Sequence, residues 1–165
     1  MLTASPAGTI AAGRRLGSRL RAGTYVALCG ELGTGKTTFV RGVAEGAGAE
    51  CPVLSPTFQI VREYAGAVTV FHLDFYRLES QAEVEALDIE SCLERGAVVA
   101  EWADRFPRML PEPFIEIRFY WENKNRRRIR IERWSASVAD AVSAALPGGG
   151  RGERKRRGAG AGAGR

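Results

Sequence analysis

The chain has 165 residues, of which 45% are hydrophobic, and this length and composition predict one globular domain with an ordinary core. It contains no apolar run long enough to cross a bilayer, so we expect no membrane span. The net charge of +5 is confined to residues 147–165, which carry six Lys or Arg and one Glu, so residues 1–146 have 18 charges of each sign. A neutral body argues against a nucleic-acid-binding domain.

The N-terminus and the cysteines indicate the compartment. The first residues lack a basic segment followed by an apolar stretch, which a secretory signal would need. Cys29, Cys51 and Cys92 are odd in number and widely spaced, so they predict neither a disulfide framework nor a metal site. We therefore expect a cytoplasmic protein.

A helix over residues 6–21 is predicted first. Ser5 followed by Pro6 is typical of a helix start, and the apolar residues that follow share one face. Residues 24–29 are short and apolar, which predicts a buried strand. A second helix is expected to follow the motif at residues 30–37 and to end at about residue 47.

Residues 30–37, G-E-L-G-T-G-K-T, match the phosphate-binding P-loop pattern G-x-x-x-x-G-K-[ST] between that strand and that helix. Glycines let the backbone wrap a phosphate, and the helix N-terminus supplies N–H groups and positive potential. Lys36 is expected to bind the outer phosphates and Thr37 to ligate Mg²⁺. The residues expected to bind the nucleotide are Leu32, Gly33, Thr34, Gly35, Lys36, Thr37 and Thr38.

The middle of the chain predicts a hairpin, a broken helix and a buried strand. Residues 57–64 and 68–74 alternate and form an expected antiparallel hairpin. Residues 79–94 are predicted to be helical in two pieces, and residues 96–102 to form a strand. Thr57, which follows a stiff Ser-Pro turn, either senses the terminal phosphate or simply begins its strand.

The C-terminal third predicts a second hairpin, with strands at 114–121 and 127–134. Ser137 and Asp140 fit a capping box that opens a last helix, and residues 147–165 form an expected disordered basic Gly/Ala/Arg tail. We therefore predict an α/β fold: one P-loop NTPase-like domain over residues 1–146, with a mixed parallel and antiparallel sheet and helices on both faces.

Two acidic residues end short apolar strands, the position at which open α/β sheets bind ligands. A P-loop needs an additional acid at Mg²⁺ and a group that orients water. Asp74 and Glu101 are the candidates for both roles, and with Lys36 they form the expected catalytic set; a turn cap and a solvated strand end are the alternatives. His72 is expected to have a structural hydrogen bond, and Trp102 to be a core or edge aromatic residue.

The tip of the second hairpin, Asn123-Lys124-Asn125-Arg126, superficially matches the guanine-reading pattern N-K-x-D. Arg126 stands where that pattern requires an aspartate. The tip is therefore interpreted as a turn, and the expected cofactors are ATP and Mg²⁺.

Four motifs occur in one order: G-E-L-G-T-G-K-T-T-F at 30–39, S-P-T-F at 55–58, H-L-D-F-Y-R at 72–77 and E-W at 101–102. Together they resemble the TsaE (YjeE) family, small ATPases of bacterial tRNA threonylcarbamoyladenosine synthesis. The resemblance implies slow ATP hydrolysis in partnership with TsaB and TsaD homologues, in support of a modification of the adenosine next to the anticodon. The transfer itself would belong to TsaD.

The resemblance also implies residue roles. Lys36 would bind phosphate and Thr37 would ligate Mg²⁺, while Asp74 and Glu101 would act at the metal or its water. The segment near Ser5–Thr9 and the hairpin tip near Arg126 would lie close to the base. Contact with tRNA would be indirect. The charge of the tail, and not the resemblance, predicts either weak, salt-dependent RNA contact or a solubilising or non-functional extension, of which the extension is favoured.

The sequence departs from the family pattern in three places. Glu31 stands where the family usually has Asp, and the basic tail lies outside the pattern. The short N-terminus predicts that any edge strand before the first helix is trimmed.

Two other functions remain open at this point. A P-loop small-molecule kinase would need an arginine-rich lid, whereas residues 79–113 are acidic, apolar and interrupted by prolines. A nucleotide-gated RNA-binding module would use the tail and the hairpin arginines Arg126, Arg127, Arg128 and Arg130, against the neutral charge of the body.

Overall fold

The computed structural model describes residues 1–50 and 60–145, to which all structural statements refer. The strands are β1 (Leu2–Thr3), β2 (Tyr25–Cys29), β3 (Val61–Tyr64), β4 (Val70–Asp74), β5 (Ala97–Glu101), β6 (Phe114–Asn123) and β7 (Arg126–Trp134). The helices are α1 (Pro6–Gly17), α2 (Lys36–Gly46), α3 (Gln81–Glu85), α4 (Ile89–Arg95) and α5 (Ala139–Ala145), with 3₁₀ turns η1 (Ala103–Arg105) and η2 (Ala136–Val138).

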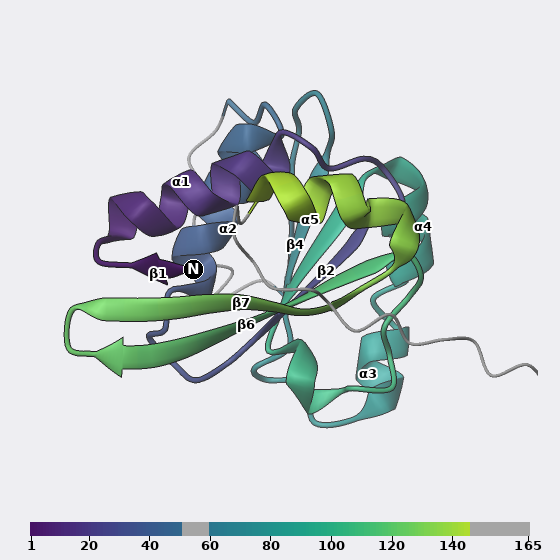
Figure 1. Ribbon diagram of the computed structural model, residues 1–165. Coiled ribbons are helices and arrows are strands. Elements are labelled where there is room, and N and C mark those ends of the chain that lie inside the picture. Colours follow the sequence, from purple (N-terminus) through teal and green to yellow (C-terminus); the bar gives the residue numbers. More distant parts are fainter. Residues whose placement is uncertain (51–59, 146–165) are drawn as a thin grey trace, which may run out of the picture.

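The strands form one mixed 7-stranded sheet in the order β1-β7-β6-β2-β5-β4-β3. The strand before the P-loop, β2, is central and runs parallel to β5 and β6, and β4 runs parallel to β5. The β3–β4 and β6–β7 pairs are antiparallel hairpins, and β6–β7 extends well beyond the other strands (Figure 1). The predicted mixed α/β sheet is confirmed.

Helices cover both faces of the sheet, as predicted. One apolar cluster joins α1, α2 and α5 to the sheet, and a second joins α3, α4 and η1 to the opposite face. Figure 1 shows α1 and α5 along one side of the sheet and α3 on the other. In the described part of the chain, no helix has the length and apolar character needed to cross a membrane.

The two helices nearest the P-loop touch through glycines. A Cβ at Gly13 would lie 2.2 Å from the carbonyl oxygen of Phe39, and one at Gly42 would lie 2.0 Å from that of Ile10. Gly17 and Gly46 make equally close approaches one turn further along each helix. Glycines that weaken helix propensity thus allow α1 and α2 to pack backbone against backbone.

The first helix begins as predicted and ends earlier. Ser5 is its N-cap and accepts a hydrogen bond from the Gly8 N–H, with Pro6 in the first turn. The helix ends at Gly17 because the Ser18 N–H closes on the Arg14 carbonyl and the chain then turns. The predicted extension to residue 21 is therefore wrong.

A short edge strand of 2 residues precedes this helix, in agreement with the expected trimming. Leu2 and Thr3 pair antiparallel with Arg128 and Arg127 of β7. The Met1 carbonyl also accepts the Ile129 N–H at 2.8 Å. A two-residue strand suffices here because the exposed edge of β7 otherwise leaves backbone donors and acceptors unpaired.

The predicted capping box at Ser137 is wrong, because Ser137 lies inside η2. The preceding serine, Ser135, bonds across the fold: its hydroxyl accepts from the Phe114 N–H at 2.9 Å and donates to Glu112. The predicted helix over 79–94 is confirmed as two pieces, with Asp88 capping the second. Residues 51–59, which include Thr57, lie outside the described residues, and so does the tail at 147–165.

Candidate nucleotide and metal site

The P-loop leaves β2 through glycines in the left-handed region of backbone conformation. Gly30, Gly33 and Gly35 have φ angles of 130°, 73° and 100°. At Gly30 a Cβ would also lie 2.4 Å from the carbonyl oxygen of Phe119 on the adjacent strand β6. Residues with a side chain would strain this loop, so the glycine spacing has a direct structural cause.

Lys36, the first residue of α2, is enclosed by the loop. Its Nζ donates to the carbonyl oxygens of Gly30 at 2.6 Å and Glu31 at 2.9 Å. The same nitrogen lies 3.8 Å from the ring centroid of Trp102. Burial lowers the pKa of Lys36, while Glu101 acts in the opposite direction. A bound phosphate would give this buried cation a counter-charge.

Glu101 at the end of β5 joins the sheet to the P-loop helix. Its Oε2 accepts the Thr37 hydroxyl at 3.0 Å, and its Oε1 lies 2.8 Å from His72 Nε2. The residue is only 4% exposed. The structure therefore brings Thr37 and Glu101 together, although they come from distant segments of the chain.

Asp74 lies directly opposite Glu101 in the β4–β5 register. Its Oδ1 accepts the Tyr76 N–H at 2.9 Å, and the side chain is half-buried. Burial raises the pKa of this carboxyl, partly offset by the Tyr76 hydrogen bond. Parallel strands β4 and β5 thus place both predicted acids at one edge of the sheet, beside α2.

These oxygens suit Mg²⁺ when a nucleotide is present. The Thr37 hydroxyl and the Glu101 carboxylate are hard oxygen donors at the start of α2. In the ranges 1–50 and 60–145, no group of three or more His, Cys, Asp or Glu side chains could hold a metal alone. Mg²⁺ commonly takes one or two protein ligands and completes its shell with water and substrate phosphates, which this donor set fits.

Two aromatic residues at the site were not predicted as site residues. Trp102 follows Glu101 with a φ of 60° and lies over Lys36, with the Tyr76 ring 5.0 Å away. Trp121 on β6 comes within 3.2 Å of a Cβ built at Gly33. The signal for Trp102 was its place directly after a strand-end acid, whereas nothing in its alternating strand distinguished Trp121.

The side of the P-loop away from β5 is also hollowed. A cavity of about 260 Å³ is lined by Gly30, Glu31, Thr34 and residues 118–121 of β6. Thr9 on α1 lies 3.7 Å from the position of a Cβ at Gly35. The start of α1 and the β6 strand therefore border the loop.

The remaining predicted site residues are spread around the loop. Thr34 is buried and donates its hydroxyl to the Glu31 carbonyl at 2.7 Å. Leu32 is 73% exposed, and Thr38 is half-buried in the first turn of α2. Arg126 is exposed at the hairpin tip.

Comparison with known proteins identifies the family of the chain. The family model for "Threonylcarbamoyl adenosine biosynthesis protein TsaE" matches residues 3–129. A Nostoc sp. protein named tRNA threonylcarbamoyladenosine biosynthesis protein TsaE is 36% identical over 141 residues, covering 82% of this chain and 86% of its own. The protein of the same name from Streptomyces coelicolor is 40% identical over 134 residues, covering 79% and 82%.

A solved structure supports the fold. The crystal structure of Bacillus subtilis YdiB matches with a TM-score of 0.74 and 26% sequence identity, covering 88% of this chain and 91% of that one. With the family match over most of its length, the chain belongs to the TsaE family of tRNA threonylcarbamoyladenosine biosynthesis proteins, as its motifs predicted.

Proposed function

We propose that this protein binds ATP and Mg²⁺ at the P-loop and hydrolyses ATP slowly, in support of threonylcarbamoyl modification of the tRNA adenosine next to the anticodon. The observation that carries the proposal is the 3.0 Å contact between Thr37 and Glu101 beside the buried Lys36. Family membership supports the pathway. The proposed partners are TsaB and TsaD homologues.

Phosphate binding would use the start of α2. The backbone N–H groups of residues 33–38 and the helix N-terminus favour an anion. Lys36 Nζ donates to the carbonyl oxygens of Gly30 and Glu31, and it would donate to phosphate oxygens instead when a nucleotide is bound. Thr37 and Glu101 would hold Mg²⁺, which neutralises phosphate charge when bound.

We propose different roles for the two acids, and their surroundings support this division. Both oxygens of Glu101 are engaged, by Thr37 and His72, which suits a metal-holding carboxylate. Asp74 is half-buried, and its Oδ1 accepts the Tyr76 N–H. Its raised pKa suits a group that orients the attacking water or accepts a proton from it. Lys36 would stabilise charge on the transferred phosphoryl group.

The nucleoside would lie between the start of α1 and the β6–β7 hairpin, near Thr9 and Trp121. Adenine is favoured over guanine, because Arg126 stands where the guanine-reading pattern requires an aspartate. Asn123 Oδ1 accepts the N–H groups of Asn125 and Arg126, both at 3.0 Å, so this side chain closes the turn.

Exposed apolar side chains beside the site support a protein partner. Leu32 on the P-loop is 73% exposed and Tyr76 after β4 is 51% exposed. Covering such groups would stabilise a complex. We propose that the TsaB and TsaD homologues cover them, that tRNA contact is indirect apart from weak contact through the tail, and that the protein acts in the cytoplasm, where tRNA is modified.

The test uses the full chain with TsaB and TsaD homologues from one organism. ATP hydrolysis is measured alone, with the pair and without Mg²⁺, and association is followed by co-purification with ATP, ADP or no nucleotide. We expect slow Mg²⁺-dependent hydrolysis that changes when the pair is added. Absence of association in every nucleotide state would reject the partnership, and absence of ATP binding would reject the site.

A further inference from the structure

We propose that His72 is a positioning residue that orients Glu101 towards Thr37. This inference rests on the proposed function of the ATP site. His72, on β4, is the only histidine of the chain and is 0% exposed. Its Nε2 lies 2.8 Å from Glu101 Oε1, on the opposite oxygen from the one that accepts the Thr37 hydroxyl.

The sheet register directs these side chains to one face. His72 pairs with Val99 and Asp74 pairs with Glu101, so alternate residues of β4 and β5 share a side. Val99 belongs to the apolar cluster that contains α2. His72 and Glu101 therefore point towards the helix that begins with the P-loop, not towards α3 and α4.

The hydrogen bond to Glu101 fixes which imidazole nitrogen is the donor. An ionised carboxylate only accepts, so His72 Nε2 must carry the proton that it shares with Glu101. Nδ1 is buried and has no hydrogen-bond partner among the described residues. The geometry therefore makes Nε2 the nitrogen that donates to Glu101.

The ring is held in place by its neighbour. The Tyr64 ring is stacked with His72 at a centroid distance of 6.3 Å and an interplanar angle of 30°. Tyr64 is itself only 4% exposed. A ring packed in this way presents Nε2 in a fixed direction and thereby restricts rotation of the Glu101 carboxylate. Outer partners of metal-binding carboxylates act in this manner in many enzymes.

The first test identifies the donor nitrogen directly. Because the chain has one histidine, protein without a histidine tag and labelled with ¹⁵N-histidine gives the ring signals of His72 alone. We expect a protonated Nε2, with its signal shifted in Glu101→Gln. An unprotonated Nε2, or an unchanged Nε2 signal in that variant, would overturn the proposal without any measurement of activity.

The second test uses two amides of different reach. In His72→Gln the side-chain N–H₂ can occupy the place of Nε2, whereas in His72→Asn it reaches only the place of Nδ1. We expect His72→Gln to keep kcat for ATP within about threefold and His72→Asn to lose about tenfold to hundredfold, with KM little changed. The Mg²⁺-dependent gain in ADP affinity, measured by calorimetry, should fall in the Asn variant only.

A double variant shows whether His72 acts through Glu101. In a Glu101→Gln background, His72→Asn should cause no further loss of kcat or of Mg²⁺-linked affinity. Equal losses in His72→Gln and His72→Asn, or full additivity with Glu101→Gln, would overturn the positioning role. Wild-type protein without ATP binding would instead reject the proposed function, so the two failures are distinguishable.

Discussion

Thr37 and Glu101 are 64 residues apart in the chain, yet the Thr37 hydroxyl donates to Glu101 Oε2 at 3.0 Å. The contact links the first turn of α2 to the end of β5, and so joins the P-loop to the acidic edge of the sheet. Both atoms are hard oxygen donors of the kind that Mg²⁺ prefers. Neutralising Glu101 should therefore affect metal-linked binding more than binding of the nucleotide itself.

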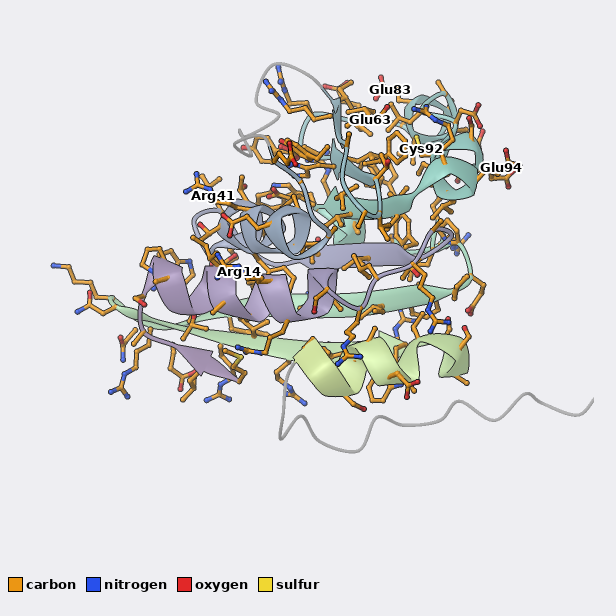
Figure 2. All side chains as sticks on the ribbon, turned by 90° about the horizontal axis from the view of Figure 1, so that it is seen from above. Arg14, Arg41, Glu63, Glu83, Cys92 and Glu94 are labelled. Carbon is orange, nitrogen blue, oxygen red and sulfur yellow. The ribbon has the colours of Figure 1, made fainter. Side chains whose placement is uncertain are left out.

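Glu101→Gln tests this. We expect ATP hydrolysis to fall by at least about tenfold, while affinity for ADP without Mg²⁺ stays within about twofold of wild type. Calorimetry with and without Mg²⁺ measures the second quantity. Glu94→Gln is the control, because Glu94 is exposed on α4 and points outward, far from Arg41 of α2 (Figure 2). Equal loss of ADP affinity with and without Mg²⁺ would contradict a metal-holding role.

The local parts of this site were predictable from the sequence. Strand, glycine loop and helix are consecutive in residues 25–46, so their pattern predicted the P-loop. Asp74 and Glu101 were predictable because the ends of parallel strands meet at one edge. The pairing of His72 with Glu101 was not, since it depends on the β4–β5 register and a single rotamer.

Other details of the fold that local patterns do not reveal have the same origin. Ser137 has the spacing of a capping box, but the preceding Ser135 bonds to Phe114 of β6, and local spacing cannot reveal that partner. The N-terminal strand forms because the edge of β7 is available, and Leu2 and Thr3 carry no strand pattern of their own. Long-range contacts decided both cases.

Lys36→Met should weaken ATP binding by at least about tenfold, because a charge-assisted contact to phosphate is lost. The fold should survive, since burial disfavours the charged form of Lys36 in the free protein, as its lowered pKa indicates. Calorimetry measures affinity and circular dichroism the fold. Lys124→Met is the control, because Lys124 is exposed at the hairpin tip. Matching affinities of the two variants would show that Lys36 does not contact phosphate.

Gly42→Ala should separate α1 from α2. Its Cβ would lie 2.0 Å from the Ile10 carbonyl oxygen and 2.9 Å from the Arg14 nitrogen, and backbone atoms cannot turn aside. We expect a loss of about 1–3 kcal/mol in the free energy of unfolding, measured by urea denaturation. In Gly8→Ala, also in the helix pair, the nearest atoms lie 3.6 Å away, so this control should be neutral or gain up to about 1 kcal/mol. Similar losses in both variants would argue against backbone-to-backbone packing.

Asp74→Asn should separate stability from activity. Burial raises the pKa of Asp74 above its ordinary value of 3.8, so the folded protein holds this proton more tightly than the unfolded chain. Stability from this group is therefore present at acid pH and falls as pH rises from 3.8 through the folded-state pKa, because the folded state binds more protons in that window. The amide stays neutral and its oxygen can still accept the Tyr76 N–H.

The variant should consequently melt at a higher temperature than wild type at pH 7 in the absence of nucleotide, with a smaller fall in stability between acid and neutral pH. ATP hydrolysis should drop by about a hundredfold or more, the range for loss of a group that handles a proton. Asp140→Asn, at an exposed site in the first turn of α5, should change neither hydrolysis nor this pH dependence. A lower melting temperature for Asp74→Asn would mean that ionised Asp74 stabilises the free protein, and unchanged hydrolysis would remove it from the catalytic set.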